Sequence, residues 1–316
     1  MRLLTDFAYL GAAAVTSPIW IARMAARGKL RTDWRARLGY VADSPAARAP
    51  DEARRRLLIH AVSVGEVNAI RALVDRLAAG PDPLDVVIAT TTDTGTARAR
   101  ELFGGRYRLV RYPFDFSAAV DRLLDAVRPD AVALVELEVW PNFVASCDRR
   151  GIPVAVINGR LSARSFRRYR LARPFLSPTF ARLAAVAAQD EAYAVRFRAM
   201  GVPAERVAVC GTMKWDTAQV VDDEGDASAK LAIDLGIDRS RPLVVAGSTA
   251  PGEHELLVAA VPPGIQLLCA PRKPEWFDDA ARVLDGCVRR SRAGAVQRTP
   301  AGRTEVRPAK PAGRGR

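Results

Sequence analysis

The chain has 316 residues, of which 49% are apolar and 7% aromatic, so it is long enough to form two domains with hydrophobic cores. Its four cysteines have no metal-like spacing and its two histidines do not cluster, which argues against a disulfide framework or a metal site and indicates a reducing compartment. The net charge is +13, but residues 292–316 hold seven Lys or Arg against one Glu and no nucleic-acid-binding motif accompanies the charge, so no nucleic-acid partner is expected.

The first predicted element is an apolar helix at the N-terminus. Phe7–Ala22 holds sixteen uncharged residues, close to the roughly 20 that a membrane span requires, although Pro18 would kink it. Six Lys or Arg follow between residues 23 and 37, and basic residues beside a membrane segment stay cytoplasmic and bind anionic lipids. Residues 1–24 are therefore predicted to be a membrane anchor, with a signal peptide and an amphipathic core helix as alternatives.

Apolar runs then alternate with helical patterns as far as residue 210. The predicted strands are Leu57–Val62, Asp85–Thr90, Ala131–Val135, Val154–Ile157, Ala184–Ala188 and Val207–Cys210. The predicted helices are Val67–Ala79, Thr94–Leu102, Phe116–Val127, Phe143–Arg149 and Ala192–Met200. Alternation at this spacing predicts an α/β domain with a doubly wound parallel sheet over residues 25–213.

A polar, acidic segment at Asp222–Asp226 marks the predicted domain boundary, with residues 214–241 as a linker. Two further βα units follow, with strands at Leu243–Gly247 and Gln266–Ala270 and helices from Glu253 and over Trp276–Leu284. Two such units make too small a sheet for independent stability, so residues 242–291 are predicted to be a partial second domain. Residues 292–316 are rich in Gly, Pro, Arg and Ala without apolar periodicity and are predicted to be disordered.

The most informative motif is His60–Glu66, which joins the first predicted strand to its helix. Ligands bind at the carboxyl edge of open α/β sheets, so a glutamate in this turn is well placed for chemistry. Ser63 and Glu66 also have the spacing of a capping box. A structural cap and a general base with a pKa raised by burial are both open interpretations of Glu66, and the two roles can coexist.

Two more motifs follow predicted strands. Thr90–Gly95 is rich in hydroxyl groups, so Thr92 or Thr94 caps the next helix, or the loop holds a sugar or an anion. Glu136 and Glu138 precede a Trp-Pro pair; in an extended segment both carboxylates would point to one face, and their repulsion would raise one pKa. The alternative is a helix with that proline in its first turn.

Three later turns also follow predicted strands: Asn158–Ser162, Gly211–Asp216 and Gly247–Glu253. The first is followed by Arg164, Arg167, Arg168 and Arg170. Arginines at this density usually form a solvated face, but they also suit a phosphorylated ligand because guanidinium matches phosphate geometry. The other two turns are candidates to face a nucleotide or a sugar acid, and His254 is interpreted as structural.

Taken in order, these segments resemble the 3-deoxy-D-manno-octulosonic acid (Kdo) transferase family of lipopolysaccharide assembly. The resemblance covers roughly residues 1–290 and is carried by the N-terminal apolar segment, His60–Glu66, Thr90–Gly95, Glu136–Asn142, Asn158–Ser162, Gly211–Asp216, Gly247–Glu253 and Ala270–Glu275. It implies two Rossmann-like domains of the glycosyltransferase B type, the second one incomplete, with a single N-terminal anchor in the inner (cytoplasmic) membrane and the globular part on the cytoplasmic side. It also implies transfer of Kdo from CMP-Kdo to a lipid A precursor, with inversion and without a metal or other cofactor.

The same resemblance implies roles for individual residues. Glu66 matches the family's general base, which takes the proton of the acceptor hydroxyl, and Glu138 matches a second acid that orients donor or acceptor. Lys214 and Arg272 are expected to balance the charge of the CMP phosphate or the Kdo carboxylate. The complete set of implied substrate-binding residues is Ser63, Gly65, Thr92, Arg160, Lys214, Ser248 and Arg272.

Two departures from the family pattern bear on activity. Arg272-Lys273 stands where the family usually has Arg-His, which alters hydrogen bonding beside the nucleotide. The family's Gly-rich, His-Asn and Glu-Pro segments, which cradle CMP, have no counterpart, so the chain is expected to be truncated, to bind CMP-Kdo weakly and to show little or no activity. The alternative functions are another sugar-nucleotide glycosyltransferase of the same fold and a non-catalytic lipid-binding remnant.

Overall fold

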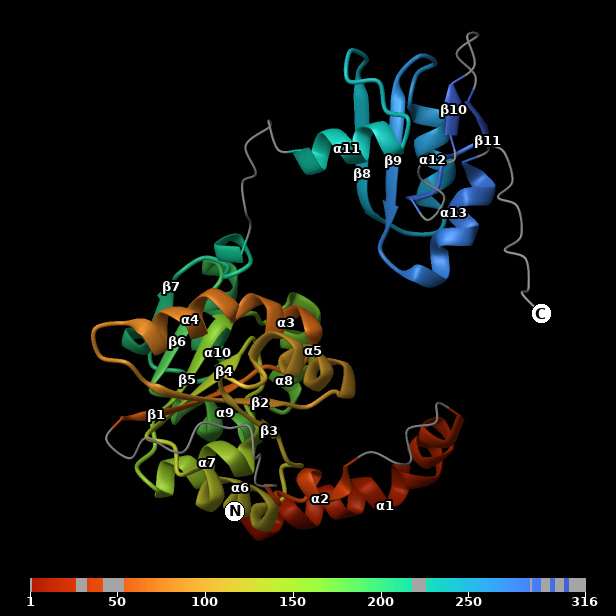
Figure 1. Ribbon diagram of the computed structural model, residues 1–316. Helices are drawn as coiled ribbons and strands as arrows, with labels where there is room; N and C mark the ends of the chain where they lie inside the picture. Colours follow the sequence, from red (N-terminus) through yellow and green to blue (C-terminus); the bar gives the residue numbers. More distant parts are fainter. Residues whose placement is uncertain are drawn as a thin grey trace, which may run out of the picture. The chain divides into compact units, whose positions relative to one another are not determined.

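The computed structural model describes residues 2–26, 33–41, 54–217, 226–284, 286–290, 296–298 and 304–306 (Figure 1). The chain divides into two compact units, unit 1 (Met1–Ala218) and unit 2 (Gln219–Arg316). Of the nine predicted site residues, all but Ser248 and Arg272 belong to unit 1.

The centre of unit 1 is a seven-stranded parallel sheet in the order β3-β2-β1-β4-β5-β6-β7. Its strands are β1 (Arg56–His60), β2 (Asp85–Thr90), β3 (Arg108–Arg111), β4 (Ala131–Val135), β5 (Val154–Gly159), β6 (Ala185–Ala188) and β7 (Val207–Val209). β1 pairs with both neighbours, so that Leu58 lies beside Val87 of β2 and Val132 of β4. The predicted parallel sheet is confirmed, and β3 is a further strand that the sequence did not indicate.

Helices cover both faces of this sheet (Figure 1). One face carries α3 (Val64–Ala69), α4 (Arg71–Ala79) and α5 (Asp93–Phe103), which pack in one hydrophobic cluster with Ile59 and Ile88. The other face carries α6 (Ser117–Val127), α7 (Pro141–Arg149), α9 (Arg173–Ala181) and α10 (Glu191–Met200), which pack in a second cluster with Leu58 and Val87. Consecutive strand residues point to opposite faces of a sheet, and the sheet is doubly wound as predicted.

The helices differ from the predicted ones after β1 and after β5, and neither of the two helices between β5 and β6 was predicted. The helix predicted over Val67–Ala79 is divided at Ile70, so that Glu66 lies in the short helix α3. The arginine-rich stretch after β5 forms α8 (Ala163–Leu171), which was not predicted and which has no buried residue. The remaining short elements of unit 1 are α2 (Trp34–Arg37), η1 (Ala204–Arg206) and η2 (Trp215–Thr217).

The N-terminal helix α1 (Arg2–Ala26) occupies the position of the predicted membrane anchor. Near its start it is held on unit 1 by polar contacts: Asp6 accepts from the backbone N–H of Ser117 at 3.0 Å, and the Tyr9 hydroxyl donates to Asp115 at 3.0 Å. Within the described part of the chain, no helix combines the length and apolar character needed to cross a membrane. The predicted helix is thus present, but with docking contacts that the prediction of an anchor did not include.

Unit 2 contains a two-stranded parallel sheet of β8 (Leu243–Thr249) and β9 (Gln266–Pro271). Its helices are α11 (Asp226–Asp234), α12 (Glu253–Ala260), η3 (Pro274–Trp276) and α13 (Phe277–Val283). Among its described residues, only Thr249, His254 and Ala280 are buried, so this small sheet encloses very little core. His254 is buried and its Nε2 lies 3.0 Å from Thr249 Oγ1, so its structural role stays a prediction that its burial supports.

The described residues reach only part of the predicted linker and tail. The acidic segment around Asp222–Asp226 lies outside them, apart from its last residue. In the tail predicted to be disordered, β10 (Val296–Arg298) pairs antiparallel with β11 (Thr304–Val306). The other residues of 292–316 lie outside the described ones.

Candidate active site

The chain changes direction at the middle of the sheet in unit 1. From β1 it continues to β2 and β3 on one side, and it then passes to β4 on the other side of β1 and on to β7. In open α/β sheets, ligands bind at such a switch point, in the crevice outside the carboxyl ends of the strands. Glu66 follows β1, and Glu136 and Glu138 follow β4, so three carboxylates flank the switch point of this sheet.

Ser63 caps the helix in which Glu66 lies, and the Glu66 carboxylate bonds back to the turn before it. Ser63 is the N-cap residue: its Oγ accepts from the backbone N–H of Glu66 at 3.4 Å and donates to Glu66 Oε1 at 2.8 Å. Glu66 Oε2 accepts from the backbone N–H of Val62 at 2.8 Å. The serine half of the predicted capping box is present, whereas the Glu66 carboxylate accepts from Val62 and not from the backbone N–H of the N-cap residue. Each carboxylate oxygen still has a lone pair for another partner.

The turn after β2 fixes the loop that carries Glu66. Thr92 is the N-cap of α5; its Oγ1 accepts from the backbone N–H of Gly95 at 3.1 Å and donates to the carbonyl oxygen of Val62 at 2.7 Å. A Cβ added at Gly95 would lie 2.6 Å from that carbonyl oxygen, so this close approach requires glycine. A Cβ added at Gly65 would meet nothing closer than Ser63 Oγ at 3.9 Å, so the backbone there is open to a ligand.

The loop after β4 is a turn and not an extended segment, so of the two alternatives left open by the sequence, the one with both carboxylates on one face of a strand is wrong. Glu136 has a left-handed φ of 62°, which non-glycine residues adopt rarely and which is concentrated at functional sites. Glu138 accepts from the indole Nε1 of Trp140 at 2.9 Å. α7 then begins at Pro141, which is the helical alternative indicated by the sequence.

Burial and mutual repulsion change the acidity of these carboxylates. Burial is the largest effect on Glu66 and raises its pKa; the hydrogen bonds from Val62 and Ser63 oppose it, and the charges of Glu136 and Glu138 add to it. Burial likewise raises the pKa of Glu138 against the hydrogen bond from the neighbouring indole, and the charge of Glu136 adds to the rise. Carboxylates with raised pKa values at a ligand-binding edge are candidates for acid–base chemistry.

The loop after β5 places a cation beside the acids. Arg160 is exposed, and a hydrogen bond with Tyr193 and the charge of Glu136 raise the pKa of its guanidinium. The backbone N–H of Arg160 also donates to the carbonyl oxygen of Glu136 at 3.4 Å. Arg160 therefore balances part of the negative charge at the switch point.

Lys214 is exposed in the turn before η2. Asn158 of β5, which has a left-handed φ of 51°, holds this turn because its Oδ1 accepts from the backbone N–H of Met213 at 3.2 Å. η2 in turn contacts α3, the helix of Glu66. The structure thus brings the seven predicted site residues of unit 1 to the carboxyl edge of one sheet: Ser63, Gly65, Glu66, Thr92, Glu138, Arg160 and Lys214.

The other two predicted residues lie together in unit 2. Ser248 has a left-handed φ of 58° near the carboxyl end of β8. The backbone N–H of Arg272, just beyond β9, donates to the carbonyl oxygen of Thr249 at 2.9 Å. Both side chains are exposed, and because β8 and β9 are parallel they share the carboxyl edge of that small sheet.

Two residues near the acids were not assigned a role from the sequence. His60 is fully buried, stacks on Tyr112 with ring centroids 3.6 Å apart, and has Nε2 2.9 Å from Thr91 Oγ1. Burial lowers the pKa of His60 to about 3, so the ring is neutral and supports the loop by packing. Burial, and then the charge of Glu138, raise the pKa of Tyr169 on α8. Neither environment has a sequence signal, because both depend on contacts between distant segments.

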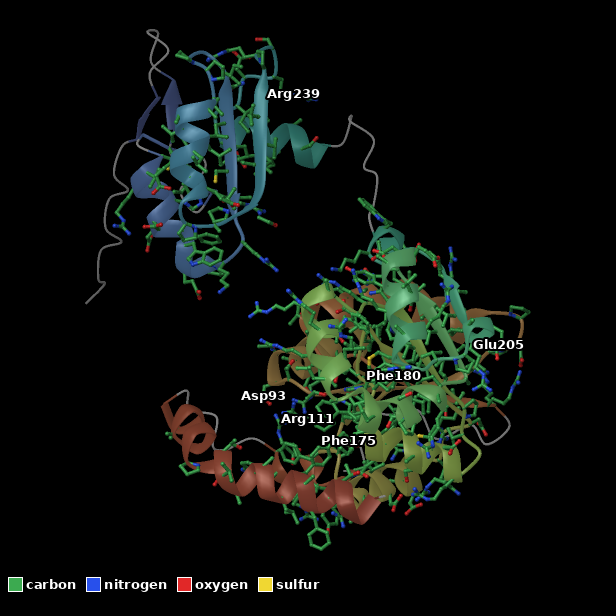
Figure 2. All side chains as sticks on the ribbon, turned by 180° about the vertical axis from the view of Figure 1, so that it is seen from behind. Asp93, Arg111, Phe175, Phe180, Glu205 and Arg239 are labelled. Atoms are coloured by element: carbon green, nitrogen blue, oxygen red, sulfur yellow. The ribbon has the colours of Figure 1, made fainter. Side chains whose placement is uncertain are left out.

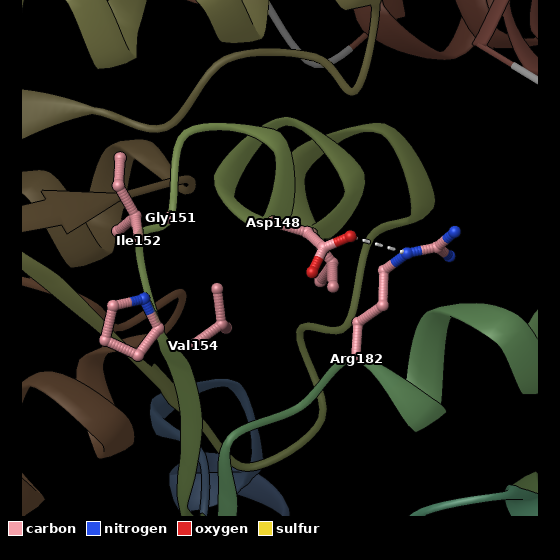
Figure 3. A pocket seen from close by; sticks show the side chains of 7 residues that line it. Asp148, Gly151, Ile152, Val154 and Arg182 are labelled. Atoms are coloured by element: carbon pink, nitrogen blue, oxygen red, sulfur yellow. Dashed lines mark hydrogen bonds and ion pairs between the residues drawn. The ribbon is translucent and has the colours of Figure 1, made fainter.

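A cavity of about 220 Å³ lies at the opposite edge of the sheet (Figure 3). Pro153 and Val154 at the start of β5 line it, together with the ion pair that Arg182 forms with Asp148 at 3.1 Å. It is therefore distinct from the edge that holds the acids. Among the residues that the structure describes, no group of three or more His, Cys, Asp or Glu is arranged to hold a metal ion.

Solved structures of UDP-N-acetylglucosamine 2-epimerases have a similar fold. The chain matches a putative epimerase from Listeria monocytogenes with a TM-score of 0.53 and 12% identity, over 74% of this chain and 67% of the other. It matches the epimerase from Neisseria meningitidis with a TM-score of 0.51 and 12% identity, over 72% and 69%. At this identity the likeness concerns the fold alone, and it defines the class as an α/β protein of the glycosyltransferase B type.

Residues 32–217 match the family described as 3-deoxy-D-manno-octulosonic-acid transferase (kdotransferase). The enzyme of that name from Haemophilus influenzae is 32% identical over 235 residues, which are 72% of this chain and 54% of the relative. The one from Bordetella pertussis is 32% identical over 252 residues, 75% of this chain and 57% of the relative. The chain belongs to the Kdo transferase family of glycosyltransferases, as its motifs predicted, and it spans about half the length of these curated relatives.

Proposed function

We propose that this protein transfers Kdo from CMP-Kdo to a lipid A precursor, with Glu66 as the general base. The observation that carries the proposal is the setting of Glu66: it lies at the switch point of the sheet, beside open backbone at Gly65, and burial and two nearby carboxylates raise its pKa. A base must remain ionised yet be basic enough to accept a proton in the transition state. Membership of the Kdo transferase family supports this choice of donor and acceptor.

In the proposed reaction, a hydroxyl oxygen of the acceptor attacks the anomeric carbon of Kdo while its proton passes to Glu66. The bond between that carbon and the phosphate oxygen of CMP breaks, and its electron pair leaves with CMP. Attack from the side opposite the leaving group inverts the configuration. Proton removal by a positioned base is typically worth about 10²–10⁴ in rate, and Glu138 is proposed to orient a substrate by accepting from its hydroxyl groups.

The exposed cations are proposed to bind the anionic groups of the substrates. Arg160 and Lys214 in unit 1 and Arg272 in unit 2 are the candidates for the CMP phosphate and the Kdo carboxylate. Fixed positive charge of this kind counts most when the leaving group departs, because negative charge then grows on the phosphate. The remaining proposed substrate contacts are Ser63, Gly65 and Thr92, in the segments that follow β1 and β2, and Ser248 near the carboxyl end of β8.

Helices α8 and α9 are proposed to contact the anionic surface of the inner membrane on its cytoplasmic side. Residues 163–181 contain no acid, and five exposed arginines there form no ion pair with any residue that the structure describes: Arg164, Arg167, Arg168, Arg170 and Arg173. Two apolar side chains near these arginines are exposed: Leu171 of α8 is 84% and Phe175 of α9 is 80% exposed. Phe180, also in α9, is buried (Figure 2). Basic residues interleaved with exposed apolar side chains are the pattern of an interfacial membrane contact.

α1 is proposed to extend this membrane surface. Its exposed side carries Phe7, Leu10 and Val15, while Asp6 and Tyr9 are directed to unit 1. Burial and Asp115 raise the pKa of Tyr9 most, and Tyr169 of α8 adds a smaller contribution. We expect the double variant Leu171→Ala/Phe175→Ala to lose most binding to vesicles with anionic lipid, and Val195→Ala, which removes an exposed apolar side chain from α10, to leave it unchanged. Equal binding of both would contradict this assignment.

The proposed reaction is tested by transfer of labelled Kdo from CMP-Kdo to the lipid acceptor at high protein concentration. Glu66→Gln keeps the size and one acceptor oxygen of the side chain, and it is expected to lower transfer by about 10²-fold or more. Glu205→Gln is the matched control, because Glu205 is an exposed glutamate of η1 away from the switch point (Figure 2). Undiminished transfer by Glu66→Gln would refute the role of this carboxylate.

Two other outcomes separate the alternative functions. Transfer from a UDP-sugar but not from CMP-Kdo would identify a different sugar-nucleotide glycosyltransferase. Binding of the lipid acceptor without transfer at any donor concentration would identify a non-catalytic lipid-binding protein. Both outcomes would refute the proposed reaction, and neither would change the family.

A further inference from the structure

A polar cluster joins α1 to the loop of Glu138, and we call its four members the clasp: the buried Asp115 and Asn142 and the half-buried Asp6 and Tyr9. Asp115 lies between β3 and α6 and is 7% exposed. Its carboxylate accepts from the Tyr9 hydroxyl at 3.0 Å. Asp6 accepts from the side-chain amide of Asn142 at 2.8 Å, and that same amide donates to the carbonyl oxygen of Asp115 at 2.6 Å. Three segments far apart in the sequence therefore meet at one point.

The clasp completes the first turn of α7. The N-cap of this helix, Trp140, forms no side-chain cap, and Pro141 has no N–H to donate. Asp115 supplies the missing acceptor: its two oxygens accept from the backbone N–H groups of Asn142 and Phe143, at 2.9 and 2.8 Å. A carboxylate at this position satisfies two donors that the helix itself leaves unpaired and also interacts favourably with the helix dipole.

The same first turn holds Glu138. The indole of Trp140 donates to the Glu138 carboxylate at 2.9 Å, and the backbone N–H of Trp140 donates to the Glu138 carbonyl oxygen at 3.1 Å. Because Trp140 directly precedes α7, a shift of the first turn moves the indole and with it the carboxylate. Burial raises the pKa of Asp115 to about 6, so the fold keeps a carboxylate here at a cost in solvation.

We propose that α1 is a positioning element for Glu138: seating of α1 through Asp6 and Tyr9 fixes Asp115 and Asn142, and these fix the turn that holds the Glu138 carboxylate. Asp6, Tyr9 and Asp115 are thus positioning residues that need not touch a substrate. The catalytic importance of Glu138 rests on the proposed function, whereas the mechanical link does not. Any event that lifts α1 from the rest of unit 1 would alter the loop that carries Glu138.

The link is tested without substrates, by following the Trp140 indole N–H resonance of the full chain during a pH titration. Because that N–H donates to Glu138, its shift reports the protonation of this carboxylate. In Tyr9→Phe and in Asp6→Ala, which removes the oxygen that accepts from Ser117 and Asn142, we expect the loop to loosen, Glu138 to gain solvent, and its titration midpoint to fall toward the ordinary value of a glutamate. Loss of one hydrogen bond in the clasp should also speed exchange of this N–H on the order of threefold to tenfold.

Tyr107→Phe is the matched control, because it also removes a tyrosine hydroxyl from unit 1, one that interacts with Asp75. This control should leave both the midpoint and the exchange rate as in the wild type. An unchanged midpoint and exchange rate in both clasp variants, with the other indole signals intact to show that they are folded, would overturn the link. A failure to transfer Kdo would leave this measurement unaffected, so the two proposals fail separately.

Discussion

Gly95 offers the sharpest stability test of the loop that carries Glu66. A methyl group at Gly95 would lie 2.6 Å from the carbonyl oxygen of Val62 and 2.8 Å from Thr92 Oγ1. These are the two atoms that join the turn after β2 to the turn after β1, at 2.7 Å. The contact with Val62 is to backbone, so it cannot be relieved by a rotamer change, and Gly95→Ala must displace one turn from the other.

The magnitude follows from two opposing effects. Overpacking of a buried contact costs about 1–3 kcal/mol, and replacing a helical glycine by alanine returns about 0.5–1 kcal/mol. Because the obstructing atom is backbone, we expect a net loss of about 1–2 kcal/mol in the free energy of unfolding of unit 1. Gly65→Ala is the matched control: it has no positive φ and no neighbour closer than 3.9 Å, so only the helical gain remains.

The two variants are compared by urea unfolding followed by circular dichroism. Gly95→Ala should lower the midpoint, and Gly65→Ala should leave it unchanged or raise it. Equal midpoints for wild type and Gly95→Ala would refute the argument from close approach. Transfer assays should give a different result from unfolding. Gly65→Ala should lose activity although it is stable, because its methyl group occupies the space proposed for a ligand.

Three further predictions concern single side chains. Ser63→Ala should lower the stability of unit 1 by about 1 kcal/mol in urea unfolding, because it removes both bonds between Ser63 and Glu66; no change would contradict the capping box. Burial raises the pKa of Asp115 from 3.8 to about 6, so the native state binds this proton more tightly than the unfolded state. The resulting contribution to the free energy of unfolding is full below pH 3.8 and is lost as the pH rises through about 6. Asp115→Asn should abolish this part of the pH dependence, as urea unfolding at several pH values would show. Burial raises the pKa of Cys147 to about 12, so at pH 8 iodoacetamide should modify the exposed Cys210 and spare Cys147, as mass spectrometry of peptides would show.

The strands of unit 1 could be predicted because burial on both faces leaves an uninterrupted apolar run. β2 and β4 match their predicted limits for this reason. β3 was not predicted because this edge strand is short and begins and ends with arginine, with only Val110 buried. α8 was not predicted because it packs no fully buried residue and therefore lacks the apolar periodicity that marks a helix.

The candidate site could be predicted where each residue follows its own strand, and not where distant segments meet. Ser63 and Glu66 are three residues apart, so their capping box is visible in the sequence. The left-handed φ of Glu136 turns the loop after β4 away from an extended form, and a glutamate gives no sequence signal for this conformation. Asp115 and Asp6 are separated by more than a hundred residues, so their common contact with Asn142 is a property of the fold alone.

The structural role of Glu66 and its proposed role as general base support one another. As a cap, the carboxylate accepts hydrogen bonds from Val62 and Ser63, which favour its ionised form. Burial and the charges of Glu136 and Glu138 act in the opposite direction and more strongly, so the pKa is raised on balance. A cap without burial would be a weak base, and burial without the cap would favour a neutral acid that could not accept a proton. The turn Ser63–Glu66 combines the hydrogen bonds with burial, and this combination suits the general base that we propose.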